Sequence, residues 1–183
     1  TIGPEGLHEI VTYDAEGHMT SKKDSNGNKY KYSYDLEGNL YCVRDPEGNR
    51  RKYDYVEGKL VSTRDGFGKK TKYTYDKNGN VASITDPTGK KTSYEYDSLG
   101  RAVKTIDGEG NVTSYTYDAE GNITSVTDPM GNVTRHTYNK AGLLTETVNP
   151  DGTKKTWQYN EIGKVAAFTD EDGRVTRMTY NTM

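Results

Sequence analysis

Hydrophobic and polar residues alternate along this chain in short stretches that are separated by turn-forming residues. Residues 113–117 and 123–127, for example, are composed of Thr, Ser, Tyr, Val and Ile in near-regular alternation. This period of two is typical of β-strands, in which successive side chains point to opposite faces of a sheet. The pattern predicts about seventeen short strands and almost no helix.

A 21-residue period organises these strands. One tyrosine marks each repeat, and successive members are 21 residues apart except for one interval of 20. Self-similarity at a fixed period of this kind is typical of repeat architectures. We therefore expect a single repeat domain over residues 1–183, with eight units whose boundaries lie near Tyr13, Tyr34, Tyr55, Tyr75, Tyr96, Tyr117, Tyr138, Tyr159 and Tyr180.

Two glycine-containing turns recur in every unit. One reads Tyr-Asp-x-x-Gly-Asn, as in residues 117–122, and the other reads Asp-Pro-x-Gly-Asn, as in residues 128–132. Each suits a type I turn followed by a glycine at positive φ, because Asp caps such a turn and glycine enters that region freely. Representative residues of this structural repeat are Tyr34, Gly38, Asp45, Gly48, Tyr117, Gly121, Asp128 and Gly131.

Turns at both ends of every strand predict an antiparallel meander of hairpins, and a parallel solenoid with one coil per repeat is the alternative. With residues 119–121 as the loop, Tyr117 faces Ile123 and Tyr115 faces Ser125. The inner tyrosine would then meet an aliphatic residue and the outer one a small residue. Such cross-strand pairs are the unit of sheet stabilisation.

The shortened unit and the odd period add two expectations. In the 20-residue unit the deletion leaves Glu57-Gly58 as a two-residue turn and keeps Tyr55 opposite Leu60. Strict alternation restores a face only after an even number of residues, so each 21-residue unit needs one bulge or one unequal turn. Regular bulges bend a sheet. We expect an all-β, solenoid-like strip that curls.

The composition excludes several classes of protein. Leu, Ile, Val and Phe together make up about 15% of the chain, which is too few for a thick aliphatic core. Formal net charge is −2 and 16 tyrosines supply bulk, so disorder is not expected either. A near-neutral chain does not favour nucleic acid as the main partner. No apolar run reaches the length of a membrane helix, so no membrane insertion is expected.

The start of the sequence predicts that it is a segment of a larger protein. The chain begins at Thr1, in the middle of the repeat pattern, and carries no leader sequence of its own. Missing signals in this segment therefore say little about the longer protein.

No set of residues converges on enzyme chemistry. The histidines His8, His18 and His136 fall at different positions of the repeat, and a single cysteine, Cys42, excludes an internal disulfide. We interpret Cys42, which faces Tyr32 in the predicted register, as a small packing residue. Trp157 stands where other units carry the outer tyrosine and is expected to be packed. The sequence predicts no catalytic residue and no cofactor.

The acidic turn residues allow two interpretations. An Asp or Asn precedes the second turn of every unit, and oxygen-rich glycine turns can bind calcium. The ligand-dense calcium patterns are absent, however, and turn capping explains the same residues. We therefore expect no metal site.

One feature is uneven along the chain. Cations share one predicted face in the early units, whereas Ser and Val occupy the same positions later. The simplest interpretation is a solvated face that protects sheet edges. The alternative hypothesis is a strip that binds an acidic glycan or wall polymer through Lys29, Lys31, Arg50, Lys52, Lys70, Lys72 and Lys91.

The recurring unit, best seen in residues 117–134, resembles the YD repeat, also called the RHS repeat. This family includes bacterial Rhs and wall-associated proteins, shell-forming subunits of insecticidal toxin complexes, and teneurins. The resemblance implies part of a hollow YD shell, which in bacterial members encloses a C-terminal toxin.

The implied function is a non-enzymatic wall segment of a secreted or surface protein, with the rest of that protein and its toxin as partners. The alternative is a carbohydrate-binding adhesion module that uses an aromatic and basic face. An open strip also exposes two strand edges, which invite self-association.

Overall fold

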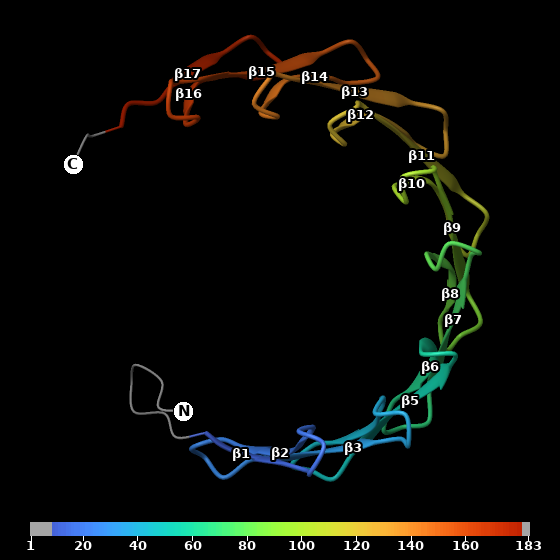
Figure 1. The fold of residues 1–183 in the computed structure, drawn as a ribbon. Helices are drawn as coiled ribbons and strands as arrows, with labels where there is room; N and C mark the ends of the chain where they lie inside the picture. The colour runs from blue at the N-terminus through green and yellow to red at the C-terminus, as the bar shows by residue number, and fades with distance from the viewer. Residues whose placement is uncertain (1–8, 181–183) are drawn as a thin grey trace. The chain divides into compact units, whose positions relative to one another are not determined.

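In a computed structural model, which describes residues 9–180, the chain forms seventeen β-strands and no helix over that range. The all-β prediction is therefore confirmed. The chain divides into two compact units, Thr1–Thr92 and Ser93–Met183. Within each unit the strands follow one another as a curved strip of hairpins (Figure 1).

The strands are short and regularly spaced. The first unit contains β1 (Ile10–Tyr13), β2 (Met19–Lys23), β3 (Lys29–Tyr34), β4 (Leu40–Arg44), β5 (Arg50–Val56), β6 (Lys59–Arg64), β7 (Lys70–Tyr75) and β8 (Val81–Thr85). Strand β9 (Lys91–Tyr96) spans the boundary. The second unit continues with β10 (Ala102–Ile106), β11 (Val112–Tyr117), β12 (Ile123–Thr127), β13 (Val133–Tyr138), β14 (Leu144–Val148), β15 (Lys154–Tyr159), β16 (Val165–Thr169) and β17 (Val175–Arg177).

Within each unit, every strand pairs antiparallel with the next one in sequence. The connections are hairpins, so the meander is confirmed and the parallel solenoid is excluded. This follows from the short loops, because parallel neighbours need crossovers of a dozen or more residues.

The turns have the geometry that their sequences predict. In the loop between β11 and β12, the N–H of Gly121 donates to the carbonyl of Asp118 at 3.3 Å, which closes the turn. The N–H of Asp118 donates to the carbonyl of Asn122 at 3.0 Å, which closes the hairpin. Gly121 has φ +93°, a region that is energetically costly for residues with a side chain.

The shortened, 20-residue repeat forms a two-residue turn, as predicted. Glu57 has φ 51° and Gly58 has φ 72°. Positive φ at both central residues is typical of the type I′ turn that matches strand twist. Tyr55 still pairs with Leu60, so the deletion preserves the cross-strand pair.

One bulge per repeat is also confirmed, and it has a fixed place. In the hairpin of β11 and β12, Tyr117 pairs with Ile123 but Thr116 pairs with Ser125, which leaves Thr124 as the extra residue. The same shift occurs just before the repeat tyrosine in each of the other hairpins that carry one.

The bulge makes one register prediction wrong. Tyr115 pairs with Val126 rather than with Ser125, because the extra residue shifts every pair beyond it by one position. Likewise Cys42 pairs with Ser33, and Val43 takes the place opposite Tyr32. The outer aromatic residue therefore meets Val, Ile, Thr or Phe across the strand instead of a small residue.

The two faces of the sheet bury different residues. The most buried side chains are small, and each lies directly after the extra residue of a bulge. Ser62 is 2% exposed and Ser83 is 3% exposed. Cys42 and Ala167, each 9% exposed, occupy the same position in other repeats. The opposite face carries the tyrosine–aliphatic pairs, which are half-buried. No thick core forms among the described residues, as the composition predicts.

Candidate functional site

The carboxylates of the turns are used for capping. In the turn between β12 and β13, Oδ1 of Asp128 accepts the N–H groups of Met130 and Asn132, each at 2.9 Å. Its Oδ2 accepts the side-chain amide of Asn132 at 2.8 Å. This amide bond is the main reason that the pKa of Asp128 lies below its ordinary value of 3.8, with the turn N–H groups adding to it.

The same capping pattern recurs in turns along the chain. An Asn four residues after the Asp donates from its side chain to the carboxylate in the pairs Asp24–Asn28, Asp35–Asn39, Asp45–Asn49, Asp76–Asn80, Asp107–Asn111 and Asp118–Asn122. Capping by itself accounts for these acidic residues, because each oxygen already accepts a donor of its own turn.

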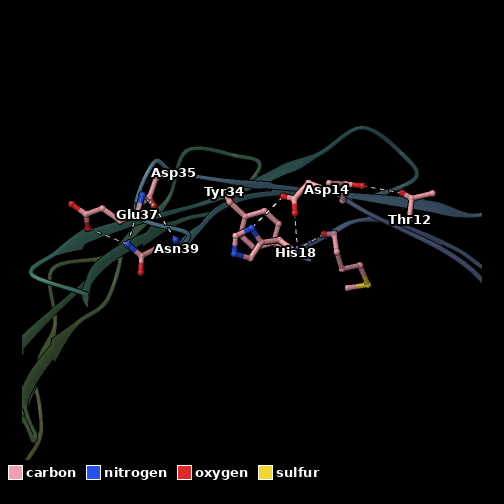
Figure 2. A network of polar contacts seen from close by, with 9 residues as sticks. Thr12, Asp14, His18, Tyr34, Asp35, Glu37 and Asn39 are labelled. Carbon is pink, nitrogen blue, oxygen red and sulfur yellow. Dashed lines mark hydrogen bonds and ion pairs between the residues drawn. The ribbon is translucent and has the colours of Figure 1, made fainter. Parts of the chain in front are cut away.

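One turn brings together two acidic side chains and a histidine. Asp14, Glu16 and His18 hold their ligand atoms within 4.8 Å of one another. His18 Nδ1 lies 3.2 Å from Asp14 Oδ2, and the His18 N–H donates to Asp14 Oδ1 at 2.8 Å. Figure 2 shows the imidazole ring lying against Tyr34, with 4.6 Å between ring centroids and 24° between planes. The histidine thus serves to cover a tyrosine of the following repeat.

The repeat tyrosines connect neighbouring hairpins through their hydroxyl groups. Tyr117 donates to the carbonyl oxygen of Ala102 at 2.6 Å, and Tyr75 donates to that of Leu60 at 2.7 Å. In every such pair the acceptor lies 15 residues earlier, in the preceding hairpin. We call these contacts tyrosine clamps, and they are made by Tyr34, Tyr75, Tyr117, Tyr138, Tyr159 and Tyr180.

A residue of the preceding hairpin also covers the ring of several clamps. The guanidinium of Arg101 lies 4.6 Å from the ring centroid of Tyr117, and Lys164 Nζ lies 4.8 Å from that of Tyr180. Arg101 in addition donates to the carboxylate of Asp97 at 2.7 Å and to the carbonyl of Asp118 at 2.9 Å. Four of the six clamps, those of Tyr34, Tyr75, Tyr117 and Tyr180, therefore combine a hydrogen bond with a stacked or cation–π contact.

The other residues that could carry chemistry are packed. Cys42 is buried with a free thiol. His136 Nδ1 lies 3.0 Å from the hydroxyl of Thr147, and Trp157 packs on Phe168 with 5.4 Å between ring centroids. His8 lies outside the described residues.

Positively charged side chains gather on one face of the first unit. Cross-strand pairing places Lys31 opposite Arg44 and Lys52 opposite Arg64. The pairs Lys23–Lys29, Arg44–Arg50 and Arg64–Lys70 extend this surface, and Lys72 lies opposite Ser62. We call it the basic face, and it comprises Lys23, Lys29, Lys31, Arg44, Arg50, Lys52, Arg64, Lys70 and Lys72.

The structure thus brings together six of the seven cations that the sequence singles out. The seventh, Lys91, is the first residue of β9 and is not among the cross-strand pairs that define the face. Lys23, Arg44 and Arg64 also belong to the basic face, although the sequence pattern does not indicate them. Without the bulge Arg44 would lie opposite Tyr30, on the other face, and the bulge moves it opposite Lys31.

The opposite face of the first unit holds a cleft of about 460 Å³. Tyr30, Tyr53, Arg51 and Phe67 line it together with the neighbouring turns. Gly66, which stands where other turns carry proline, allows this close approach, because a Cβ there would lie 3.0 Å from the Cβ of Asn49.

Fold and clamps together define a β-hairpin repeat protein, in which the hydroxyl groups of the repeat tyrosines connect hairpins to the preceding ones. The chain belongs to the teneurin YD-shell family, whose model matches residues 45–183. The model of the RHS repeat matches residues 13–51. The resemblance that the sequence suggests is therefore confirmed. No curated protein matches the chain.

Two solved structures of toxin complexes contain a region with this fold. A crystal structure of TcdB2-TccC3 superposes with a TM-score of 0.75 at 15% identity, over 94% of this chain and 11% of that one. A structure of the Photorhabdus luminescens Tc holotoxin pore gives a TM-score of 0.62 at 17% identity, over 88% of this chain and 12% of that one. At these identities the likeness shows the fold alone, and the chain spans about a ninth of those chains.

Over the described residues, no helix has the length and apolar character needed to cross a membrane.

Proposed function

We propose that this chain is a non-enzymatic stretch of wall in a longer, secreted or surface-displayed YD-shell protein, and that the closed wall encloses a toxin. The tyrosine clamps are the observation that carries the proposal. Six tyrosines each fasten one hairpin to the preceding one, which is what a sheet only one layer thick needs in order to keep its shape.

The partners follow from the same proposal. The outer strands β1 and β17 would pair with further hairpins of the longer protein, and the enclosed toxin would lie against one face of the wall. The two solved toxin-complex structures support this, since this chain matches only 11% and 12% of their length.

Protease protection of the natural full-length protein tests the wall function. The enclosed region should resist trypsin in the intact protein and become digestible when Tyr75, Tyr117 and Tyr159 are changed to Ala. The matched control changes Tyr73, Tyr115 and Trp157, whose rings are not clamps, to Ala. If the control opens the protein equally, or if no region is protected in the intact protein, the wall function is wrong.

A carbohydrate-binding adhesion module is the second candidate function. The basic face favours it, because eight of its nine cations are exposed, which is more positive charge than a passive wall requires.

A further inference from the structure

The cleft beside Gly66 is built from residues that depart from the repeat. Tyr30 lies four residues before a repeat tyrosine, at a position that holds Thr in five other repeats. Phe67 lies directly before the glycine of its turn, where the other turns of this type carry polar residues or Met130. Departures from an otherwise consistent pattern are expected at functional sites. Here three of them, Gly66 included, meet around one cleft of about 460 Å³.

The aromatic rings that line the cleft are not used up by packing. Phe67 is 88% exposed, Tyr30 is 40% exposed, and Tyr53 is half-buried. Among the described residues, none of these three rings stacks on another ring or lies under a cation. Aromatic side chains stabilise a fold or an interface mainly through the apolar area that they bury. The open area of these rings is therefore available to a ligand.

The side chains around the cleft carry more negative than positive charge. Asp45, Glu47 and Asp65 contribute three carboxylates, and Arg51 contributes one cation. Arg50 also borders the cleft, but it alternates with Arg51 along β5, so its side chain belongs to the basic face on the other side of the sheet. Three negative charges and one positive charge leave a formal net charge of −2 on this side.

Two of these carboxylates have oxygens that the turns do not use. Both oxygens of Asp45 accept donors of Asn49, as in the other capped turns. In the following turn Lys69 stands in place of that Asn. Oδ1 of Asp65 accepts two N–H groups of its own turn, at 3.0 and 2.9 Å, and its Oδ2 has no donor among the described residues. Glu47 is exposed, and over the same range its carboxylate forms no ion pair. The cleft therefore combines open aromatic rings with carboxylate oxygens that can attract a cation.

We propose that this cleft binds a quaternary ammonium group of the kind that choline carries. The methyl groups of such a cation are apolar and fit against ring faces, and its positive charge is attracted both to those faces and to the carboxylates. A primary ammonium suits the cleft less well, because it is strongly hydrated and needs an acceptor for each N–H. The inference is independent of the wall function and of the basic face, since it concerns the opposite side of the sheet.

NMR titration of the whole chain at about 0.15 M salt tests this inference with choline and three related compounds. The alcohol 3,3-dimethylbutan-1-ol has the shape of choline without its charge, 3,3-dimethylbutyrate carries a negative charge instead, and ethanolamine lacks the methyl groups. Choline should bind about tenfold more tightly than each of the three. Phosphocholine identifies the source of the group: it binds more tightly than choline if the group is recognised on a phosphate-bearing headgroup, and more weakly if it is recognised on the free compound.

The test variant is Tyr30→Thr/Phe67→Thr. Other repeats carry Thr71 and Thr88 at these two positions, so the variant should fold, which its thermal midpoint checks. Its affinity for choline should fall about tenfold, because two of the three rings are lost. The matched control, Tyr115→Thr/Met130→Thr, removes a tyrosine and a large turn residue from the second unit and should keep the affinity.

Two charge variants have expected effects of opposite sign. Glu47→Gln removes a carboxylate and should weaken choline binding, whereas Arg51→Gln removes the cation and should strengthen it, each by about twofold to threefold. Both residues are exposed, so neither substitution disturbs a buried contact.

Four results would overturn the inference. They are choline binding no tighter than that of the alcohol, the carboxylate or ethanolamine, equal losses in the test variant and the control, charge effects of reversed sign, and no choline binding at all. None of these results would alter protease protection of the full-length protein, so this inference and the wall function fail separately.

Discussion

At the scale of single residues, the repeat tyrosine performs three tasks. Its ring pairs across the hairpin with an aliphatic residue, as Tyr117 does with Ile123. The hydroxyl of Tyr117 donates to Ala102 in the preceding hairpin, and its ring lies under Arg101. A single side chain therefore joins two neighbouring hairpins, in addition to the backbone hydrogen bonds and the cross-strand pairs between them.

Substitution of one clamp measures its contribution. Tyr117→Phe removes the hydroxyl and leaves the carbonyl of Ala102 without this donor, so the free energy of unfolding should fall by about 1 kcal/mol. Urea denaturation checks this value. Tyr115→Phe is the control, since its hydroxyl has no hydrogen-bond partner among the described residues. Equal losses in the two variants would show that the clamp adds nothing.

The turn aspartates make stability depend on pH. Hydrogen bonds from Asn132 lower the pKa of Asp128 in the folded state below the ordinary 3.8. Its stabilising effect is therefore fully present above pH 3.8 and is lost as pH falls through the lower folded-state pKa. Carboxyl NMR titration should show a midpoint below 3.8 for Asp128. In Asn132→Ala the midpoint should rise toward 3.8, and an unchanged midpoint would contradict the assignment.

The sequence predicts part of this residue chemistry and misses the rest. Turn geometry fixes the pair Tyr117–Ile123, because these residues adjoin Asp118 and Asn122, which close the three-residue loop. The acceptor Ala102 lies 15 residues away in another hairpin, and its carbonyl carries no side-chain signal. The residue directly after the first turn's glycine is His18, Lys59, Arg101 or Lys164 in four of the repeats, and only the structure shows that all four contact the ring of the next repeat tyrosine.

At the scale of the hairpin, the bulge decides what each face presents. The odd repeat length predicts that a bulge exists, but the sequence does not mark which residue is extra. Thr124, Tyr41 and Val61 occupy the bulge position, so it has no residue signature. The shift of one residue moves Arg44 and Arg64 onto the basic face, where they lie opposite Lys31 and Lys52.

The two-residue turn of the 20-residue repeat carries backbone strain that another residue would relieve. Glu57 adopts φ 51°, which Asn tolerates better than Glu. Glu57→Asn should therefore raise the free energy of unfolding by roughly 0.5 kcal/mol, as measured by thermal or urea denaturation. Glu120→Asn provides the comparison, because Glu120 does not have positive φ and should show no gain. A gain at Glu120 as large as at Glu57 would refute the backbone explanation.

At the scale of the whole molecule, the two edge strands of the sheet determine how the isolated chain associates. Among the described residues, β1 pairs only with β2, and β17 pairs only with β16. Ile10 is 60% exposed on β1 and Val175 is 49% exposed on β17. Exposed apolar edge strands of this kind are templates for pairing with another chain.

The isolated chain should therefore self-associate through these edges. Light scattering should show a mass that rises with concentration, and the double variant Ile10→Glu/Val175→Lys should suppress the rise. The control Leu99→Glu/Ile162→Lys changes two turn residues that are each 72% exposed and should leave the association intact. A strict monomer at high concentration would contradict this prediction.

Repeat stacking explains how so few aliphatic residues make a stable sheet. Each hairpin contributes its own pairs plus an interface with its neighbour, so stability accumulates along the strip. In the proposed wall, the same stacking would continue into further repeats of the longer protein.

Electron cryo-microscopy of the natural full-length protein tests the central claim most directly. The account predicts that residues 45–183 lie in the wall of a closed hollow shell, as successive antiparallel hairpins joined by tyrosine clamps, with further density enclosed inside. An open strip that surrounds no volume would contradict the wall function, and so would repeats that stand apart as a separate domain.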